Sequence, residues 1–130
     1  MKIKIINKFV FFLAILYLTI IFCVYFFQEK LLFHPVSIYR MPPKSFKIEQ
    51  KFIQKENGDS LYTWWQENNN SGETLVFFNG NAGNITGRTF FVDIANQLEQ
   101  NILLFDYTGF GASIGEISSK QGFYDDANLA

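Results

Sequence analysis

The stretch FFNGNAGN, residues 77–84, turns an apolar, strand-like segment into a helix-like one within a few residues. The apolar run TLVFF, residues 74–78, is typical of a short strand that is buried on both faces. Residues 86–100 place apolar side chains at helical spacing, and Thr86 or Thr89 is suited to cap that helix. These apolar positions are Phe90, Phe91, Ile94, Ala95 and Leu98. The stretch therefore predicts a strand, a glycine-containing loop and a helix in succession.

The same pattern recurs further along the chain. NILLFDY, residues 101–107, predicts a second buried strand, and the glycine-rich TGFGASIGE follows it. A second helix is expected next, with Ser118 or Ser119 as its cap. Before both units, residues 46–65 predict an antiparallel hairpin around the turn Asn57-Gly58-Asp59. We therefore expect an α/β fold in which both glycine loops lie at the carboxyl ends of parallel strands, where such sheets bind ligands.

The N-terminal part of the chain carries a long uncharged run at residues 9–27. As a helix it would span roughly 28 Å, close to the hydrocarbon thickness of a bilayer. A cleaved signal peptide is the alternative, but its apolar region is shorter and ends in small residues. We expect an uncleaved single-pass anchor in contact with the bilayer. Lysines before the run favour a cytoplasmic N-terminus, although basic residues also follow it.

Composition restricts the rest of the chain to one domain. The predicted organisation is an anchor at residues 1–27, a proline-containing connector at 28–45 and a partial domain at 46–130. The single cysteine, Cys23, has no partner for an internal disulfide. Acidic residues outnumber basic ones beyond the anchor, so no nucleic acid partner is expected. No metal and no cofactor is predicted.

Three chemistries use exposed backbone at the end of a strand. AGNITGRT imitates a phosphate-binding P-loop, but Ala82 replaces its first glycine and Arg88 its lysine. GFGASIG, residues 109–115, is one residue too long for a dinucleotide fingerprint. The third chemistry is an oxyanion hole, in which fixed N–H donors stabilise the negative oxygen of a tetrahedral intermediate. A tight turn without any ligand is the structural alternative.

Two long motifs carry a family resemblance. LVFFNGNAGNITGR and NILLFDYTGFGASIGEISSKQGFYDDANLA, in this order, resemble the α/β-hydrolase superfamily. They are similar to a branch of single-pass, membrane-anchored, depalmitoylase-like serine hydrolases, whose corresponding stretches read FHGNAGN and DYRGYGKSEG. The anchor followed by QEKLLFHP also matches the layout of that branch. The resemblance implies the first half of an α/β-hydrolase fold, ending before the nucleophile elbow.

The resemblance also implies roles for individual residues. The oxyanion-hole loop would be formed by Asn79, Gly80, Asn81, Ala82, Gly83 and Asn84, and its expected donor is the backbone N–H of Asn81. The neighbouring loop would be shaped by Asp106, Tyr107, Gly109 and Gly111. Two positions depart from the pattern, because Asn79 stands where the family usually has histidine and Thr108 where it usually has arginine.

A complete catalytic triad is not expected within these residues. Ser113, in Gly111–Gly115, matches G-x-S-x-G by letters, but that motif must directly follow a strand and enter a helix. The only histidine, His34, is expected to be a stalk residue. The family's nucleophile, acid and histidine would lie beyond Ala130. We therefore expect the N-terminal portion of a hydrolase of acyl esters or thioesters, inactive by itself. The alternatives are a phosphate- or nucleotide-binding module and a non-catalytic, membrane-tethered interaction stub.

Overall fold

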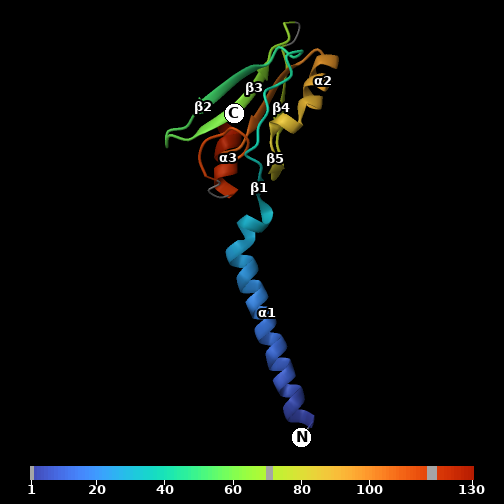
Figure 1. Cartoon of the computed structure of the whole chain (residues 1–130), viewed down its shortest axis with the longest axis vertical. Helices are drawn as coiled ribbons and strands as arrows, with labels where there is room; N and C mark the ends of the chain where they lie inside the picture. Colours follow the sequence, from blue (N-terminus) through green and yellow to red (C-terminus); the bar gives the residue numbers. More distant parts are fainter. Residues whose placement is uncertain (1, 70–71, 117–119) are drawn as a thin grey trace. The chain divides into compact units, whose positions relative to one another are not determined.

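The chain divides into two compact units, residues 1–33 and 34–130. A computed structural model describes residues 2–69, 72–116 and 120–130, and Figure 1 shows the helices and strands along the chain. The first unit contains one helix, α1 (Lys2–Leu32), whose apolar side chains from Ile6 to Leu32 are exposed. From Ile6 to Leu32 this helix is long and apolar enough to cross a membrane, a property that an N-terminal signal sequence shares.

The second unit is built on a four-stranded mixed sheet. Its strands are β2 (Glu49–Gln54), β3 (Ser60–Gln66), β4 (Thr74–Phe78) and β6 (Asn101–Asp106), in the order β2-β3-β6-β4. The pairs β2–β3 and β3–β6 are antiparallel, whereas β4 and β6 are parallel. The helices are α2 (Thr89–Gln97) and α3 (Lys120–Leu129), with a short 3-10 helix at Ile85–Gly87. The predicted α/β class, with a hairpin before the parallel strands, is confirmed.

The hairpin turn has the chemistry that the sequence predicts. Gly58 has a φ of +91°, a conformation that glycine adopts without strain. The Lys55 N–H donates to the Asp59 carbonyl at 2.9 Å and closes the turn. The strands that leave this turn pair along their whole length, from Gln54 with Ser60 to Glu49 with Trp65.

The core lies between the sheet and α2. Trp64 is only 1 % exposed, and α2 contributes Val92 and Ala95 to the same cluster. The other buried members of the cluster are Tyr62, Ile85, Ile102 and Leu104. Because β3 and β6 are the two inner strands of the sheet, they supply most of the buried side chains of this cluster.

The expectation that TLVFF is buried on both faces is wrong. Val76 is 42 % exposed and Phe78 is 52 % exposed. Within the described residues β4 pairs with β6 alone and forms an edge of the sheet. A shallow apolar groove of about 280 Å³ lies beside it, lined by residues of β4, α2 and β6. An apolar run therefore identified the strand, but burial also depends on layers and neighbours that a local pattern does not contain.

The predicted caps also differ from the observed ones. Thr86 lies inside the 3-10 helix, and the Asn84 side chain caps that helix by accepting from the Thr86 N–H. Arg88 precedes α2 and its side chain makes no capping bond. Ala95 is buried as expected, but Phe90, Ile94 and Leu98 are exposed, and Val92 is buried instead. The proposed caps Ser118 and Ser119 lie outside the described residues.

A second, two-stranded sheet joins the N-terminal part of this unit to the first glycine loop. Its strands are β1 (His34–Pro35) and β5 (Ala82–Gly83), which pair in parallel. The segment after α1 is therefore hydrogen-bonded to the loop that follows β4, and it does not run free as a stalk.

Candidate functional site

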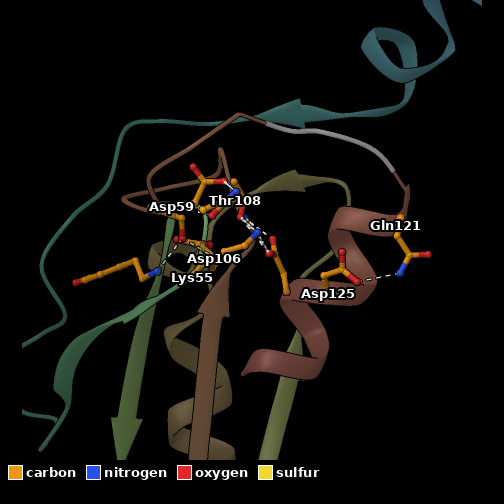
Figure 2. Close-up of polar contacts among 10 residues, drawn as sticks. Lys55, Asp59, Asp106, Thr108, Gln121 and Asp125 are labelled. Carbon is orange, nitrogen blue, oxygen red and sulfur yellow. Dashed lines mark hydrogen bonds and ion pairs between the residues drawn. The ribbon is translucent and has the colours of Figure 1, made fainter.

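The two glycine loops emerge at the same end of the sheet, from the carboxyl ends of β4 and β6. We call residues 79–84 the candidate oxyanion loop and residues 107–115 the neighbouring loop. Because β4 and β6 are parallel and pair Phe78 with Phe105, the loops that follow them begin side by side. Figure 2 shows the polar contacts at this end of the sheet.

Asp106, the last residue of β6, is a buried carboxyl group between the two loops. It is fully buried, and its Oδ1 accepts a hydrogen bond of 2.8 Å from the Ile85 N–H. Its Oδ2 has no partner among the described residues. Burial raises the pKa of Asp106 to about 7, against the opposing effects of the Ile85 N–H, the Asn79 amide and the positive charge of Arg88. This carboxyl group ties the residue after the candidate oxyanion loop to the end of β6.

Gly111 is required by its closeness to that carboxylate. A Cβ added at this position would lie 1.9 Å from Asp106 Oδ2, and the φ of +56° is unfavourable for other residues. Gly109 also has a positive φ, of +83°. The predicted pair of loop glycines is thus explained by backbone conformation and by the packing of the loop on Asp106.

Asn79 begins the candidate oxyanion loop beside the same carboxylate. It is 6 % exposed, and within the described part of the chain neither atom of its amide reaches a hydrogen-bonding partner. The amide nevertheless lies close enough to Asp106 to lower the pKa of that carboxyl. At the position where the family resemblance implies a histidine, this chain therefore has a neutral amide, that of Asn79, beside the buried carboxyl group of Asp106.

The other residues of the candidate oxyanion loop are divided between exposed and buried positions. Gly80, Asn81 and Ala82 are exposed, whereas Gly83 is half-buried and has a φ of +80°. The Asn81 carbonyl accepts from the His34 N–H at 2.9 Å. Asn84 is buried and hydrogen-bonded, as described below. The structure thus brings all the predicted loop residues to this end of the sheet, while the donor role of the Asn81 N–H remains a prediction.

A buried ion pair supports the neighbouring loop, and the sequence did not predict it. Lys55 Nζ lies 2.6 Å from Asp126 Oδ1 of α3 and donates to Thr108 Oγ1 at 3.1 Å. Asp126 also accepts from the Thr108 N–H at 2.8 Å (Figure 2). Thr108, at the position where the resemblance implies an arginine, is therefore hydrogen-bonded to the cation of Lys55. Because Lys55 and Asp126 are 71 positions apart, no local signal could have paired them.

Tyr107 anchors the start of the neighbouring loop by its ring. The ring is largely buried and packs edge-on against Phe105 and tilted against Phe123 of α3. Burial raises the pKa of the Tyr107 hydroxyl. Aromatic packing therefore holds α3 next to the end of β6.

Ser113 has a structural role in the described arrangement. Its hydroxyl donates to the Asp106 carbonyl at 2.6 Å and accepts from the Tyr62 N–H at 2.8 Å. The residue lies in a loop that begins after β6 ends at Asp106, and not at a sharp turn between a strand and a helix. The hydroxyl is thus engaged by the backbone of two strands, as expected for a serine that is not the nucleophile.

Several consecutive backbone N–H groups in the two glycine motifs donate hydrogen bonds within the chain. In the P-loop-like segment, the N–H groups of residues 85–88 donate to Asp106 Oδ1, Asn84 Oδ1, the Asn84 carbonyl and the Ile85 carbonyl. In the neighbouring loop, residues 110, 111, 113 and 114 also donate to backbone carbonyls. A P-loop needs such consecutive N–H groups for its phosphate. This geometry argues against the nucleotide-binding alternatives.

Within the described ranges, no three His, Cys, Asp or Glu side chains gather as metal ligands would.

Known proteins with sequences similar to this chain include an α/β hydrolase domain-containing protein. The chain is 36 % identical over 114 residues to an alpha/beta hydrolase domain-containing protein, WAV2 of Arabidopsis thaliana, covering 80 % of this chain and 37 % of WAV2. It is 29 % identical over 93 residues to the uncharacterized protein YfhR of Escherichia coli K12, covering 68 % of this chain and 32 % of YfhR. No family model matches the sequence.

A solved structure has a similar fold. The esterase Pf2001 of Pyrococcus furiosus superimposes with a TM-score of 0.64 at 21 % sequence identity, covering 75 % of this chain and 38 % of the esterase. At 21 % sequence identity, this structural similarity shows a shared fold and nothing more. The chain spans only 32–38 % of the length of these three proteins.

Proposed function

The chain belongs to the α/β-hydrolase superfamily, and from this premise we propose that it forms the N-terminal portion of a membrane-anchored serine hydrolase acting on acyl esters or thioesters. One observation carries the proposal. The loop after β4 and the loop after β6 lie side by side at the carboxyl ends of parallel strands, tied together by Asp106. This is the end of the sheet at which α/β hydrolases stabilise the oxyanion of acyl transfer.

In this proposal the candidate oxyanion loop supplies one N–H donor. The Asn81 N–H is the expected donor, on an exposed stretch whose ends are held by Asn79 and Asn84. A donor of this kind lowers the barrier by about 2.7–4 kcal/mol. The nucleophile, acid and histidine would come from sequence that follows these residues in the complete hydrolase.

The experiment compares the 130-residue chain with a chain extended by the downstream half of a relative that carries G-x-S-x-G, an acid and a histidine. The short chain should not react with a fluorophosphonate probe, whereas the extended chain should hydrolyse p-nitrophenyl or thioester substrates. Replacing the elbow serine by alanine should abolish that activity. Labelling of the short chain at Ser113 would overturn the proposal.

The donor itself is tested in the extended chain. Asn81→Pro removes the N–H and should lower kcat about 10²–10³-fold. Asn81→Ala keeps the N–H and serves as the matched control, so its kcat should stay within about threefold of the parent. Equal losses in the two variants would exclude the Asn81 N–H as the donor.

Membrane attachment is the second part of the proposal. The uncharged run at residues 9–27 is proposed to span the bilayer once, with the N-terminus in the cytoplasm. The chain should stay in the membrane fraction in alkaline carbonate, and its mature N-terminus should precede the run. Lysines placed at Leu13 and Ile20 should release it. A mature chain that begins after residue 27 would instead identify a cleaved signal peptide.

A further inference from the structure

The segment that follows α1 lies along both glycine loops. β1 begins at His34, two residues along the chain from Leu32, the last residue of α1. The His34 N–H donates to the Asn81 carbonyl at 2.9 Å, and β1 pairs in parallel with Ala82 and Gly83. We call residues 34–39 the strap.

One carbonyl of the strap receives hydrogen bonds from both loops. Val36 O accepts from Asn84 Nδ2 at 2.9 Å and from the Gly111 N–H at 3.0 Å. Asn84 and Gly111 are 27 positions apart in the sequence. The strap therefore bridges the candidate oxyanion loop and the neighbouring loop through a single acceptor.

Asn84 connects the strap to the candidate oxyanion loop. It is 5 % exposed, and its Nδ2 donates both to Val36 O and, at 2.7 Å, to Ile38 O. Its Oδ1 accepts from the Thr86 N–H at 3.1 Å and from Thr86 Oγ1 at 2.5 Å. The amide thus uses two donors toward the strap and two acceptor directions toward the 3-10 helix. Aspartate would keep the acceptors but lose both donors.

The far end of the strap packs on the sheet. The Tyr39 ring meets the buried Tyr62 ring of β3 edge-on, with centroids 5.3 Å apart. The strap is therefore held at its start by β5, in its middle by Asn84 and Gly111, and at its end by β3. With attachments at three points along its length, the strap is expected to be well ordered.

We propose that the strap fixes the conformation of the candidate oxyanion loop and that Asn84 is its positioning residue. A trans peptide unit is planar, so the bond from His34 to the Asn81 carbonyl orients the Asn81–Ala82 peptide, which directly follows the Gly80–Asn81 peptide that carries the proposed donor N–H. The consequence for catalysis rests on the proposed function, whereas the mechanical role of the strap does not. An oxyanion donor must be held in place before the reaction, and here part of that support comes from the segment next to the apolar helix.

The test measures amide hydrogen exchange of the full chain in detergent micelles, without substrate. Asn84→Asp should speed exchange at Gly111 and His34 by at least about tenfold, because both hydrogen bonds from Asn84 Nδ2 to the strap are lost. The Thr86 amide should stay within about threefold of its original rate, because the acceptor is retained. Thr86→Val, which leaves both Nδ2 donors intact, is the control and should not change exchange at Gly111.

A second pair of variants keeps the proposal testable if Asn84→Asp does not fold. His34→Pro removes the N–H that binds the Asn81 carbonyl, and His34→Ala retains it. Exchange at Gly111 should be faster in His34→Pro than in His34→Ala. Unchanged exchange at Gly111 in both Asn84→Asp and His34→Pro would overturn the proposal. An equal loss of protection at Gly111 and at Leu104 in the centre of β6 would overturn it too, by showing a general loss of stability. Neither result depends on hydrolytic activity, so each is distinguishable from failure of the proposed function.

Discussion

Asp106 is a buried carboxyl group whose ionisation the fold opposes, and Asp106→Asn should remove a large pH dependence of stability. Burial raises the pKa of Asp106 from 3.8 to about 7 in the folded chain. Between these pH values the unfolded chain has released the proton and the folded chain still holds it. The free energy of unfolding therefore falls as pH rises from about 4 through about 7, and it is constant above that range.

The size of the effect follows from this interval. Roughly three pH units at about 1.4 kcal/mol each set an upper limit of about 4 kcal/mol for the loss of stability. Asparagine is neutral at every pH and can still accept the hydrogen bond from the Ile85 N–H. Its free side-chain N–H₂ would also face the amide of Asn79, whose oxygen lacks a partner in the described structure. We expect the variant to match the parent only below about pH 4, and its advantage in stability over the parent to grow by about 2–3 kcal/mol between pH 5 and pH 8.

The assay is urea unfolding of the full chain in mild detergent, followed by tryptophan fluorescence between pH 5 and pH 9. Both tryptophans lie in β3, and Trp64 is buried in the core, so their emission reports the unfolding of this unit. Asp125→Asn is the control, because Asp125 is exposed on α3 and its replacement changes the same charge without burial. A constant difference between Asp106→Asn and the parent across this range would refute the reasoning, since Asp106 would then be ionised throughout.

Three further predictions concern packing, charge and the strap. Gly111→Ala should lower the free energy of unfolding by at least about 3 kcal/mol, because the added methyl group would lie 1.9 Å from a buried carboxyl oxygen of Asp106. Gly80→Ala is the control, since a Cβ at Gly80 would have nothing within 4 Å, and it should change stability by less than about 1 kcal/mol in the same urea assay. Lys55→Met should lower the free energy of unfolding by about 3 kcal/mol, because it leaves Asp126 buried without its cation. Adding Asp126→Leu should recover part of that loss. A double variant that is less stable than Lys55→Met alone would contradict this explanation. Residues 45–130 alone lack the strap and carry the exposed apolar edge of β4, so they should be poorly soluble or molten. A sharp cooperative melt with well-dispersed amide resonances would show otherwise.

The order of the elements and the position of the two glycine loops follow from local patterns in the amino-acid sequence. Apolar runs, the turn at Asn57–Asp59 and the spacing of residues 86–100 are local signals, and each involves residues within about one helix length of one another. The long uncharged run in α1 is a signal of the same kind. These features predicted the mixed sheet and the end at which its site loops lie.

The side chains that support those loops come from segments far apart in the sequence. Lys55 meets Asp126, Asn84 meets the backbone of Val36, and the Ser113 hydroxyl accepts from the Tyr62 N–H, across separations of 48 to 71 positions. The exposure of β4 likewise depends on which strands and helices flank it. Contacts of this kind form between segments that share no local pattern, so their partners are set by the three-dimensional arrangement of the chain. The same holds for Asp106, whose raised pKa arises from burial that no neighbouring residue in the sequence reveals.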